Sequence, residues 1–287
     1  MSGTVLILGA TGRFGRHAAE AFWNAGWRVR VFDRAEGDLV NAAMGADVIV
    51  NAWNSAHDRW EDDLPHLTQR VIDAAQASGA TVLIPSHLNP ARHRLERVRI
   101  GMEDTYRRSG VRTIILRSGD FIDTEPTGTR FDRVAAAKLH QGVVIRPDRA
   151  DAAHHWAYLP DLARAAVALA ERREFLERFE DVSFTGYALT FDKLTELLSS
   201  ASGRTLRQRA FPGWAVLPML PVWNTGRHLF GGRSPRSMPR RIDGSRFDAL
   251  VPGFRQTPPL IAIAAAIRHQ IDPDNAVARG TLDLAAQ

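Results

Sequence analysis

The sequence predicts an α/β fold, a doubly wound parallel sheet followed by a small C-terminal lobe. An apolar run opens the chain and ends in closely spaced glycines. Strand and helix patterns then alternate through the first two-thirds of the 287 residues, which indicates a parallel sheet covered by helices. The last third is less regular and rich in Pro, Trp and Phe, which fits a separate lobe.

The first strand and helix carry the strongest motif. Residues 4–8 are predicted to form a buried strand, and G-x-x-G-x-x-G follows at residues 9–15. Such glycines let the backbone approach a pyrophosphate, which sits on the free N–H groups at the helix start. A second strand ends in Asp33, where a carboxylate commonly meets the adenosine ribose. The motif predicts a Rossmann-type domain; a glycine turn that serves only packing is the alternative.

The later strands and helices are predicted from the residues that typically begin and end such elements. The link from residue 34 to 45 is short, so we expect one crossover of the sheet to be trimmed. Further strands are expected at 46–51, 81–84, 112–116 and 182–184, and helices at about 61–78, 94–109, 161–171, 190–198 and 259–269. We expect a dinucleotide-binding domain at 1–186, with excursions near 120–155, and a smaller substrate-binding lobe at 187–287.

Composition narrows the classes of function. The chain has no cysteine, which excludes disulfides, thiolate metal sites and a cysteine nucleophile. Neither a secretory signal pattern nor an apolar run of membrane-spanning length is present, so we expect a cytoplasmic protein without a membrane partner. The net charge is +5, but the arginines are spread among many acids. Solvated faces explain this better than nucleic-acid contact, so we expect no nucleic-acid partner.

Further motifs accompany the glycine turn and Asp33. They are residues 46–52, Glu103 with Ser109-Gly110 before residues 113–117, and residues 156–163. In this order they resemble the extended and atypical short-chain dehydrogenase/reductases, the NAD-dependent epimerase/dehydratase group that includes NmrA-like proteins. The resemblance covers roughly residues 4–200. It is specific for a fold and not for a substrate.

The resemblance implies a bound NAD, with NADP as the alternative. Asp33 would accept hydrogen bonds from the ribose hydroxyls and repel a 2′-phosphate, whereas Arg34 could pair with that phosphate. The cofactor-binding residues that the resemblance implies are Gly9, Thr11, Gly12, Arg13, Phe14 and Gly15 around the pyrophosphate, Asp33 at the ribose, Asp38 and Leu39 at the adenine, Asn51, Ala52 and Trp53 at the middle of the cofactor, and Pro85 and Ser86 near the nicotinamide. Arg34 at the 2′-phosphate and Arg99 at a ribose complete the expected cofactor site.

The chain departs from the family at its catalytic pair. Family members that transfer a hydride carry Y-x-x-x-K, and no such motif occurs here. The corresponding positions hold Leu95, which cannot transfer a proton, and Arg99, which could hold a ribose but is a poor proton shuttle. Ser86 and His87 are the replacement candidates, since His87 titrates in the physiological range. A loop histidine that only forms hydrogen bonds is the alternative.

A substrate pocket is expected between the strand ends and the C-terminal lobe. Its predicted residues are Asp120, His155, Trp156, Trp214 and Trp223. His57 and its acidic neighbours have an unconvincing spacing for a metal, so no metal is expected. We expect an oxidoreductase or isomerase acting on a small molecule; a non-catalytic, NmrA-like dinucleotide sensor is the alternative. A homodimer through the helices at 61–78 and 94–109 is the expected assembly.

Overall fold

A computed structural model describes most of the chain, and everything below concerns that part. The described residues are 3–33, 37–54, 59–87, 94–146, 153–210 and 242–271, with the backbone alone for 94–96. Arg34, His57, Trp214 and Trp223 therefore lie outside the described residues.

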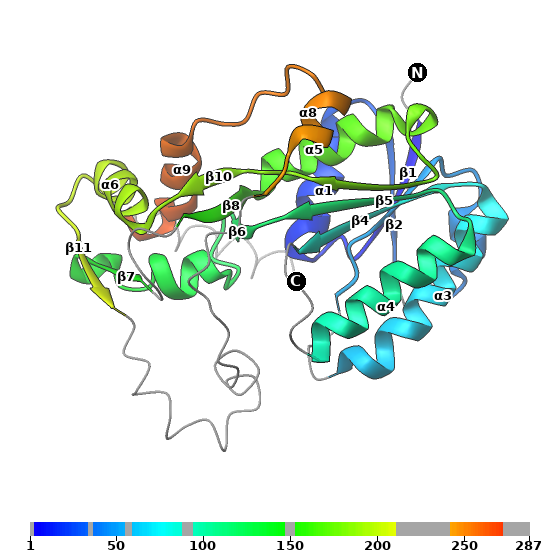
Figure 1. Ribbon diagram of the computed structural model, residues 1–287, viewed down its shortest axis with the longest axis horizontal. Helices are drawn as coiled ribbons and strands as arrows, with labels where there is room; N and C mark the ends of the chain where they lie inside the picture. The colour runs from blue at the N-terminus through cyan, green and yellow to red at the C-terminus, as the bar shows by residue number, and fades with distance from the viewer. Residues whose placement is uncertain are drawn as a thin grey trace, which may run out of the picture.

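A six-stranded parallel sheet forms the centre of the main domain (Figure 1). In order across the sheet, its strands are β2 (Arg28–Phe32), β1 (Thr4–Leu8), β3 (Val48–Asn51), β4 (Thr81–His87), β5 (Thr113–Ser118) and β9 (Phe179–Ser183). The register is continuous at the centre, where Val5 pairs with both Val29 and Val48. The predicted parallel α/β sheet is confirmed.

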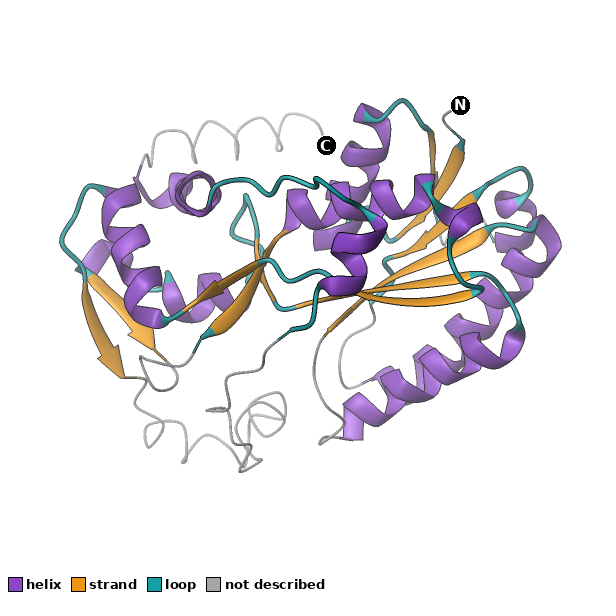
Figure 2. Ribbon diagram, turned by 45° about the horizontal axis from the view of Figure 1, so that its top comes forward, coloured by secondary structure: helices purple, strands orange, loops and turns teal. Residues whose placement is uncertain are grey.

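Helices cover both faces of this sheet, as Figures 1 and 2 show. They are α1 (Arg13–Asn24) and α5 (Leu159–Glu171) on one face, and α2 (Leu39–Ala43), α3 (Trp60–Ser78) and α4 (Arg94–Ser109) on the other. Strand β1 alternates between two cores: Ile7 packs in the cluster of α1 and α5, whereas Leu6 packs in that of α2, α3 and α4. This period of two explains why β1 is apolar throughout.

The crossover from β2 to β3 is trimmed, as expected from the length of its link. From residue 37 onward, where it is described, the crossover contains only the five-residue helix α2, and within the described part of the chain β2 pairs with β1 alone. Asp38 begins α2 by accepting hydrogen bonds from the backbone N–H groups of Val40 (2.9 Å) and Asn41 (3.2 Å). The sheet thus ends at β2.

A second group of elements, here called the small lobe, lies beside the carboxyl ends of the central strands (Figure 1). It contains a three-stranded sheet of β10 (Tyr187–Leu189), β8 (His154–Tyr158) and β6 (Asp120–Ile122), a two-stranded sheet of β7 (Val143–Arg146) and β11 (Arg207–Ala210), and the helices α6 (Phe191–Ser202) and α9 (Pro259–Ile271). Its core includes Phe131, Leu194 and Ile263. Ile122, Val144 and Trp156 also pack in this core, whereas Ala157 packs in the core of the main domain. The short helix α8 (Ser245–Leu250) packs against the main domain through Phe247.

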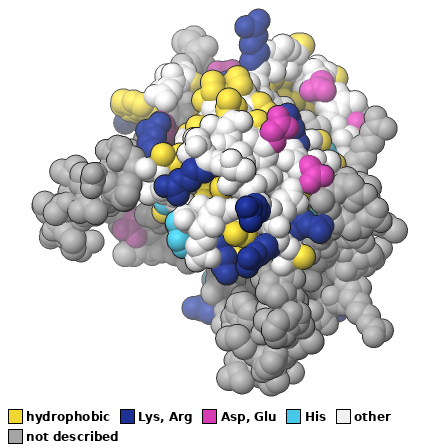
Figure 3. Space-filling view, turned by 90° about the vertical axis from the view of Figure 1, so that its left-hand side faces the viewer, with side chains coloured by type: hydrophobic (Ala, Val, Ile, Leu, Met, Phe, Trp, Pro, Cys, Tyr) yellow, Lys and Arg dark blue, Asp and Glu magenta, His cyan; other side chains and the backbone are white. Residues whose placement is uncertain are grey.

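The outer end of the small lobe carries a mixed surface. Figure 3 shows its Lys and Arg side chains interspersed with acidic and apolar ones. Among the residues that the structure describes, no helix is long and apolar enough to cross a membrane.

Candidate functional site

The glycine turn lies at the carboxyl end of β1, between that strand and α1. Gly9 has φ +76°, and a Cβ there would lie 2.9 Å from the carbonyl oxygen of Ala52. A Cβ on Gly15 would collide with the Gly9 carbonyl oxygen. Both positions require glycine, because the turn, the loop after β3 and the first turn of α1 approach each other closely.

The start of α1 is open to an anion. Gly12 is its N-cap residue and supplies no side-chain hydrogen bond, and the first turn contains no acidic residue. The backbone N–H of Gly12 donates to Gly9 (2.9 Å), which closes the turn. The N–H groups of the first helical turn and the positive end of the helix dipole are therefore available for a phosphate.

A hydrogen-bonded chain fixes the end of β3 beside this turn. Asn51 Nδ2 donates to the hydroxyl of Tyr106 (3.1 Å), and the backbone N–H of Trp53 donates to Asn51 Oδ1 (3.3 Å). Burial raises the pKa of Tyr106 above its ordinary value, so this tyrosine stays neutral. Tyr106 thus positions the predicted cofactor residues 51–53 and does not itself face the open edge of the sheet.

The predicted adenosine residues lie beyond β2. Asp33 is exposed directly after that strand, whereas Leu39 is buried under α2. The Asp38 carboxylate is engaged in capping α2. The Trp53 indole packs edge-on against Phe32, with ring centroids 5.7 Å apart, and therefore joins the glycine turn to this side of the site.

Ser86 at the end of β4 points into an ion-pair network. It is 2% exposed, and its hydroxyl donates to Glu103 Oε1 (2.7 Å). Glu103 also accepts from Arg117 Nη2 (2.6 Å), and the Arg117 guanidinium binds both carboxylate oxygens of Asp181 (2.7 and 2.8 Å). Burial lowers the pKa of Arg117, but the hydrogen bonds to Asp181 and Glu103 outweigh it and raise the pKa. Ser86 is therefore held in place by the network of Glu103, Arg117 and Asp181.

His87 is the last residue of β4, and Arg99 lies in the first half of α4. The half-buried His87 ring stacks on Phe121, with centroids 5.1 Å apart. The Arg99 guanidinium lies over the Trp60 ring, 4.8 Å from its centroid. Burial, opposed by Glu103, lowers the pKa of Arg99, and its buried Nε has no hydrogen-bond partner among the described residues. Arg99 can thus still donate a hydrogen bond to a ligand.

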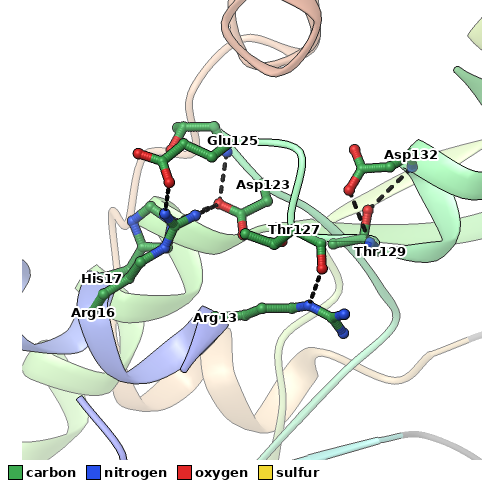
Figure 4. Close-up of polar contacts among 9 residues, drawn as sticks. Arg13, Arg16, His17, Asp123, Glu125, Thr127, Thr129 and Asp132 are labelled. Atoms are coloured by element: carbon green, nitrogen blue, oxygen red, sulfur yellow. Dashed lines mark hydrogen bonds and ion pairs between the residues drawn. The ribbon is translucent and has the colours of Figure 1, made fainter. Parts of the chain in front are cut away.

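A loop of the small lobe, residues 123–130 and here called the strap, is bound to the first turns of α1 (Figure 4). Arg13 Nε donates to the carbonyl of Thr127 (2.9 Å), and its Nη2 donates to that of Gly128 (3.2 Å). The side chain of Arg13 thus joins the start of α1 to the small lobe, and its backbone lies in the first turn of α1.

Asp123 anchors the strap and is fully buried. Its carboxylate forms hydrogen bonds with His17 Nε2 (2.8 Å) and Thr127 Oγ1 (2.6 Å), and an ion pair with Arg16. Burial raises the pKa of Asp123, but the contacts with His17, Thr127 and Arg16 outweigh it, so the pKa lies below its ordinary value. The sequence contains no signal for this contact, since it joins residues more than 100 positions apart in the chain.

The predicted substrate residues separate into two groups. Asp120 forms an ion pair with Arg130 (3.0 Å), and the half-buried His155 has its Nδ1 3.0 Å from the carbonyl oxygen of Thr185. The Trp156 indole is 1% exposed and packs between Phe131 and Phe191 in the small-lobe core. In this structure Trp156 is therefore a core residue, whereas Asp120 and His155 remain partly accessible.

These features define a Rossmann-type α/β protein with a small lobe at the carboxyl ends of its strands. Searches with this chain find no matching family model and no matching curated protein. Solved structures do match. They include a nucleoside-diphosphate-sugar epimerase from Staphylococcus aureus (TM-score 0.68, 18% identity, 92% of this chain and 100% of that one) and a UDP-glucose 4-epimerase from Brucella ovis in complex with NAD (TM-score 0.68, 18% identity, 94% and 99%).

A third similar structure is the triphenylmethane reductase of Citrobacter sp. (TM-score 0.66, 15% identity, 92% of this chain and 99% of that one). The same reductase is also known complexed with NADP(H). Epimerases and a reductase of this architecture are the kind of protein that the sequence resembles. At 15–18% sequence identity, the similarity to these structures shows a shared fold and no more.

Proposed function

We propose that this protein binds a nicotinamide dinucleotide, NAD or NADP, and acts as an oxidoreductase or isomerase on a small organic molecule. The observation that carries the proposal is the glycine turn. It requires glycine at positions 9 and 15 and leads into a helix start without a capping side chain. This is the cradle that a pyrophosphate needs. The matching epimerase and reductase structures support the same choice.

The residues present fit such a cofactor. Gly9, Gly12 and the start of α1 would hold the pyrophosphate, Asp33 the adenosine ribose, and Arg99 a polar group near the nicotinamide. When bound, the nicotinamide would supply a hydride donor or acceptor. The exposed Asp33 would repel a 2′-phosphate, so we propose NAD ahead of NADP.

Proton transfer would fall to His87 in this proposal. It is half-buried and lies at the carboxyl end of a central strand, where ligands of such sheets bind. Ser86 would act as a positioning residue, because its hydroxyl donates to Glu103.

A dinucleotide sensor without catalysis is the second candidate function. The observation that favours it is the placement of the three tyrosines, since none lies at the family's catalytic position. The Tyr106 hydroxyl accepts from Asn51, Tyr158 occupies the N-cap position of α5 without a side-chain capping bond, and Tyr187 donates to the carbonyl of Thr257 (2.6 Å). A sensor would keep the cofactor site and lack turnover.

Turnover distinguishes the two functions. Purified protein would be incubated with reduced cofactor and a panel of carbonyl compounds and nucleotide sugars, while the absorbance of the reduced nicotinamide and the sugar products are followed. An enzyme gives turnover with one substrate class that falls in His87→Ala. Tight dinucleotide binding with no turnover in the whole panel would favour the sensor.

We also propose that the protein works in the cytoplasm as a homodimer through α3 and α4. These two helices pack side by side (Figure 1) and present one continuous layer.

A further inference from the structure

Two arginines bind one carbonyl group where the small lobe meets the start of α1. The Arg13 side chain extends from α1 to the strap (Figure 4), and its Nη2 donates to the carbonyl of Gly128 (3.2 Å). Arg133 lies in the short helical segment Phe131–Ala135 of the small lobe, and its Nε donates to the same carbonyl oxygen (2.6 Å). A Cβ on Gly128 would lie 3.6 Å from a nitrogen of each guanidinium, so the two cationic groups flank this residue.

Neither guanidinium is neutralised by a carboxylate. In the described part of the chain, no ion pair is formed by Arg13 or Arg133, whereas the neighbouring Arg16 is paired with Asp123. Burial lowers the pKa of Arg13, and the charge of Arg133 lowers it further. The carboxylates of Asp123 and Asp132 oppose this shift without reversing it. Two like charges held together favour an anion that both can bind.

Both guanidinium groups keep donors for such an anion. An arginine has five N–H donors. Among the described contacts, Arg13 uses two of them on the carbonyls of Thr127 and Gly128, and Arg133 uses one on Gly128. Both arginine side chains are exposed, so a solute can reach them. The planar fork of a guanidinium matches the spacing of carboxylate and phosphate oxygens.

We propose that Arg13 and Arg133 form an anion site between the two lobes, and that this site holds the carboxylate or phosphate group of an acidic substrate. The inference rests on the proposed function and adds a substrate class to it. The site is separate from the backbone N–H groups that would receive the pyrophosphate, because it consists of side chains that contact the strap. One of its two cations comes from the small lobe, so an anion bound there connects this lobe to α1.

The test uses inorganic phosphate and acetate as probes, with and without saturating NADH. Their binding would be measured by calorimetry for the wild type, Arg133→Gln and Arg133→Lys. Arg204→Gln, which removes an exposed arginine elsewhere in the small lobe, is the charge-matched control. Arg133→Gln is expected to weaken phosphate binding by about 10-fold and to leave NADH affinity unchanged. Arg133→Lys should recover only part of the loss, because lysine keeps the charge without the fork.

The probe that binds more tightly identifies the acid group of the substrate. Equal phosphate affinity of wild type and Arg133→Gln, or no saturable binding of either probe, would overturn the inference while leaving the proposed function intact. So would competition between phosphate and NADH, because the anion would then occupy the place of the dinucleotide's pyrophosphate.

A folded wild type that does not bind NADH would contradict the proposed function, whereas phosphate binding that depends on Arg133 would still support the anion site itself. Circular dichroism of each variant separates a binding loss from unfolding.

Discussion

At the scale of single residues, buried carboxylates hold the segments around the candidate site. Glu103 joins β4 and β5 through Ser86 and Arg117, Asp123 fixes the strap to α1, and Asp161 accepts from the backbone N–H of Thr257 (2.7 Å). Each carboxylate is buried, so the loss of one partner would leave a charge or donor without compensation. We therefore expect substitutions of these carboxylates to lower the stability of the protein.

The variant Asp123→Asn tests whether the buried carboxylate of the strap stabilises the protein. The variant should lower the free energy of unfolding at neutral pH by about 3 kcal/mol, because Arg16 would lose a buried anionic partner. The folded-state pKa of Asp123 is below its ordinary value, so its stabilisation is present above the unfolded pKa of about 4 and is lost as the pH falls through the folded pKa. Urea denaturation from pH 7 to pH 3 should therefore show the two proteins converging in acid. A difference that grows in acid would contradict the role given to Asp123.

Ser86→Ala separates a positioning role from a catalytic one. The variant removes a buried hydrogen bond to Glu103 and should cost about 1 kcal/mol of stability. Dinucleotide affinity should stay the same, and turnover should change much less than in His87→Ala. If turnover collapses while stability and binding are unchanged, Ser86 contacts the reacting atoms and our assignment is wrong.

At the scale of elements, the glycine turn depends on close backbone approach. Gly15→Ala places a methyl group against the Gly9 carbonyl and should destabilise the protein by about 1–3 kcal/mol and abolish dinucleotide binding. Gly101→Ala on α4 is the matched control, because a Cβ there meets nothing within 4 Å. The control should raise stability by about 0.5–1 kcal/mol, as alanine favours helix more than glycine does. Thermal and urea unfolding measure both, and a neutral Gly15→Ala would refute the close-packed turn.

The elements that could be predicted are those with strong local patterns. The apolar central strands, the glycine turn and the trimmed crossover follow from residues close in the sequence. The short strands β6, β7, β8, β10 and β11 were not predicted, because each has only three to five residues and is stabilised by partners far along the chain.

Contacts between residues far apart in the sequence also explain why parts of the candidate site could not be predicted. Asp123 of the strap meets His17 of α1, and Arg13 of α1 meets the carbonyl of Thr127, both in contacts between the small lobe and the main domain. Neither contact leaves a local motif. The position of Trp156 just before the helix at 161–171 favours a pocket residue, yet its ring packs between two phenylalanines. An aromatic residue next to polar ones does not show which face of a strand it occupies.

At the scale of the whole molecule, the small lobe is attached to the main domain near the starts of α1 and α5. The strap holds the start of α1, and Asp161 on α5 accepts hydrogen bonds from the backbone and hydroxyl of Thr257 (2.7 and 2.8 Å), just before α9. Because the strap contacts the helix start that would receive the pyrophosphate, dinucleotide binding should also steady the small lobe. Hydrogen exchange should show slower exchange in residues 123–130 when NADH is added.

The proposed homodimer can be tested with the same purified protein. Light scattering at moderate salt should give the mass of a dimer. Arg97, Arg107 and Arg108 are exposed on α4, so like charges must be paired across a two-fold axis there. A monomer at high protein concentration would contradict the proposed interface.

Dinucleotide binding itself is the central claim, and calorimetric titration of the wild-type chain with NADH and NADPH tests it most directly. Our account predicts saturable binding of one dinucleotide per chain, tighter for NADH than for NADPH because of Asp33, and its loss in Gly15→Ala. A wild-type protein that is folded by circular dichroism and shows no saturable binding of either dinucleotide would contradict it.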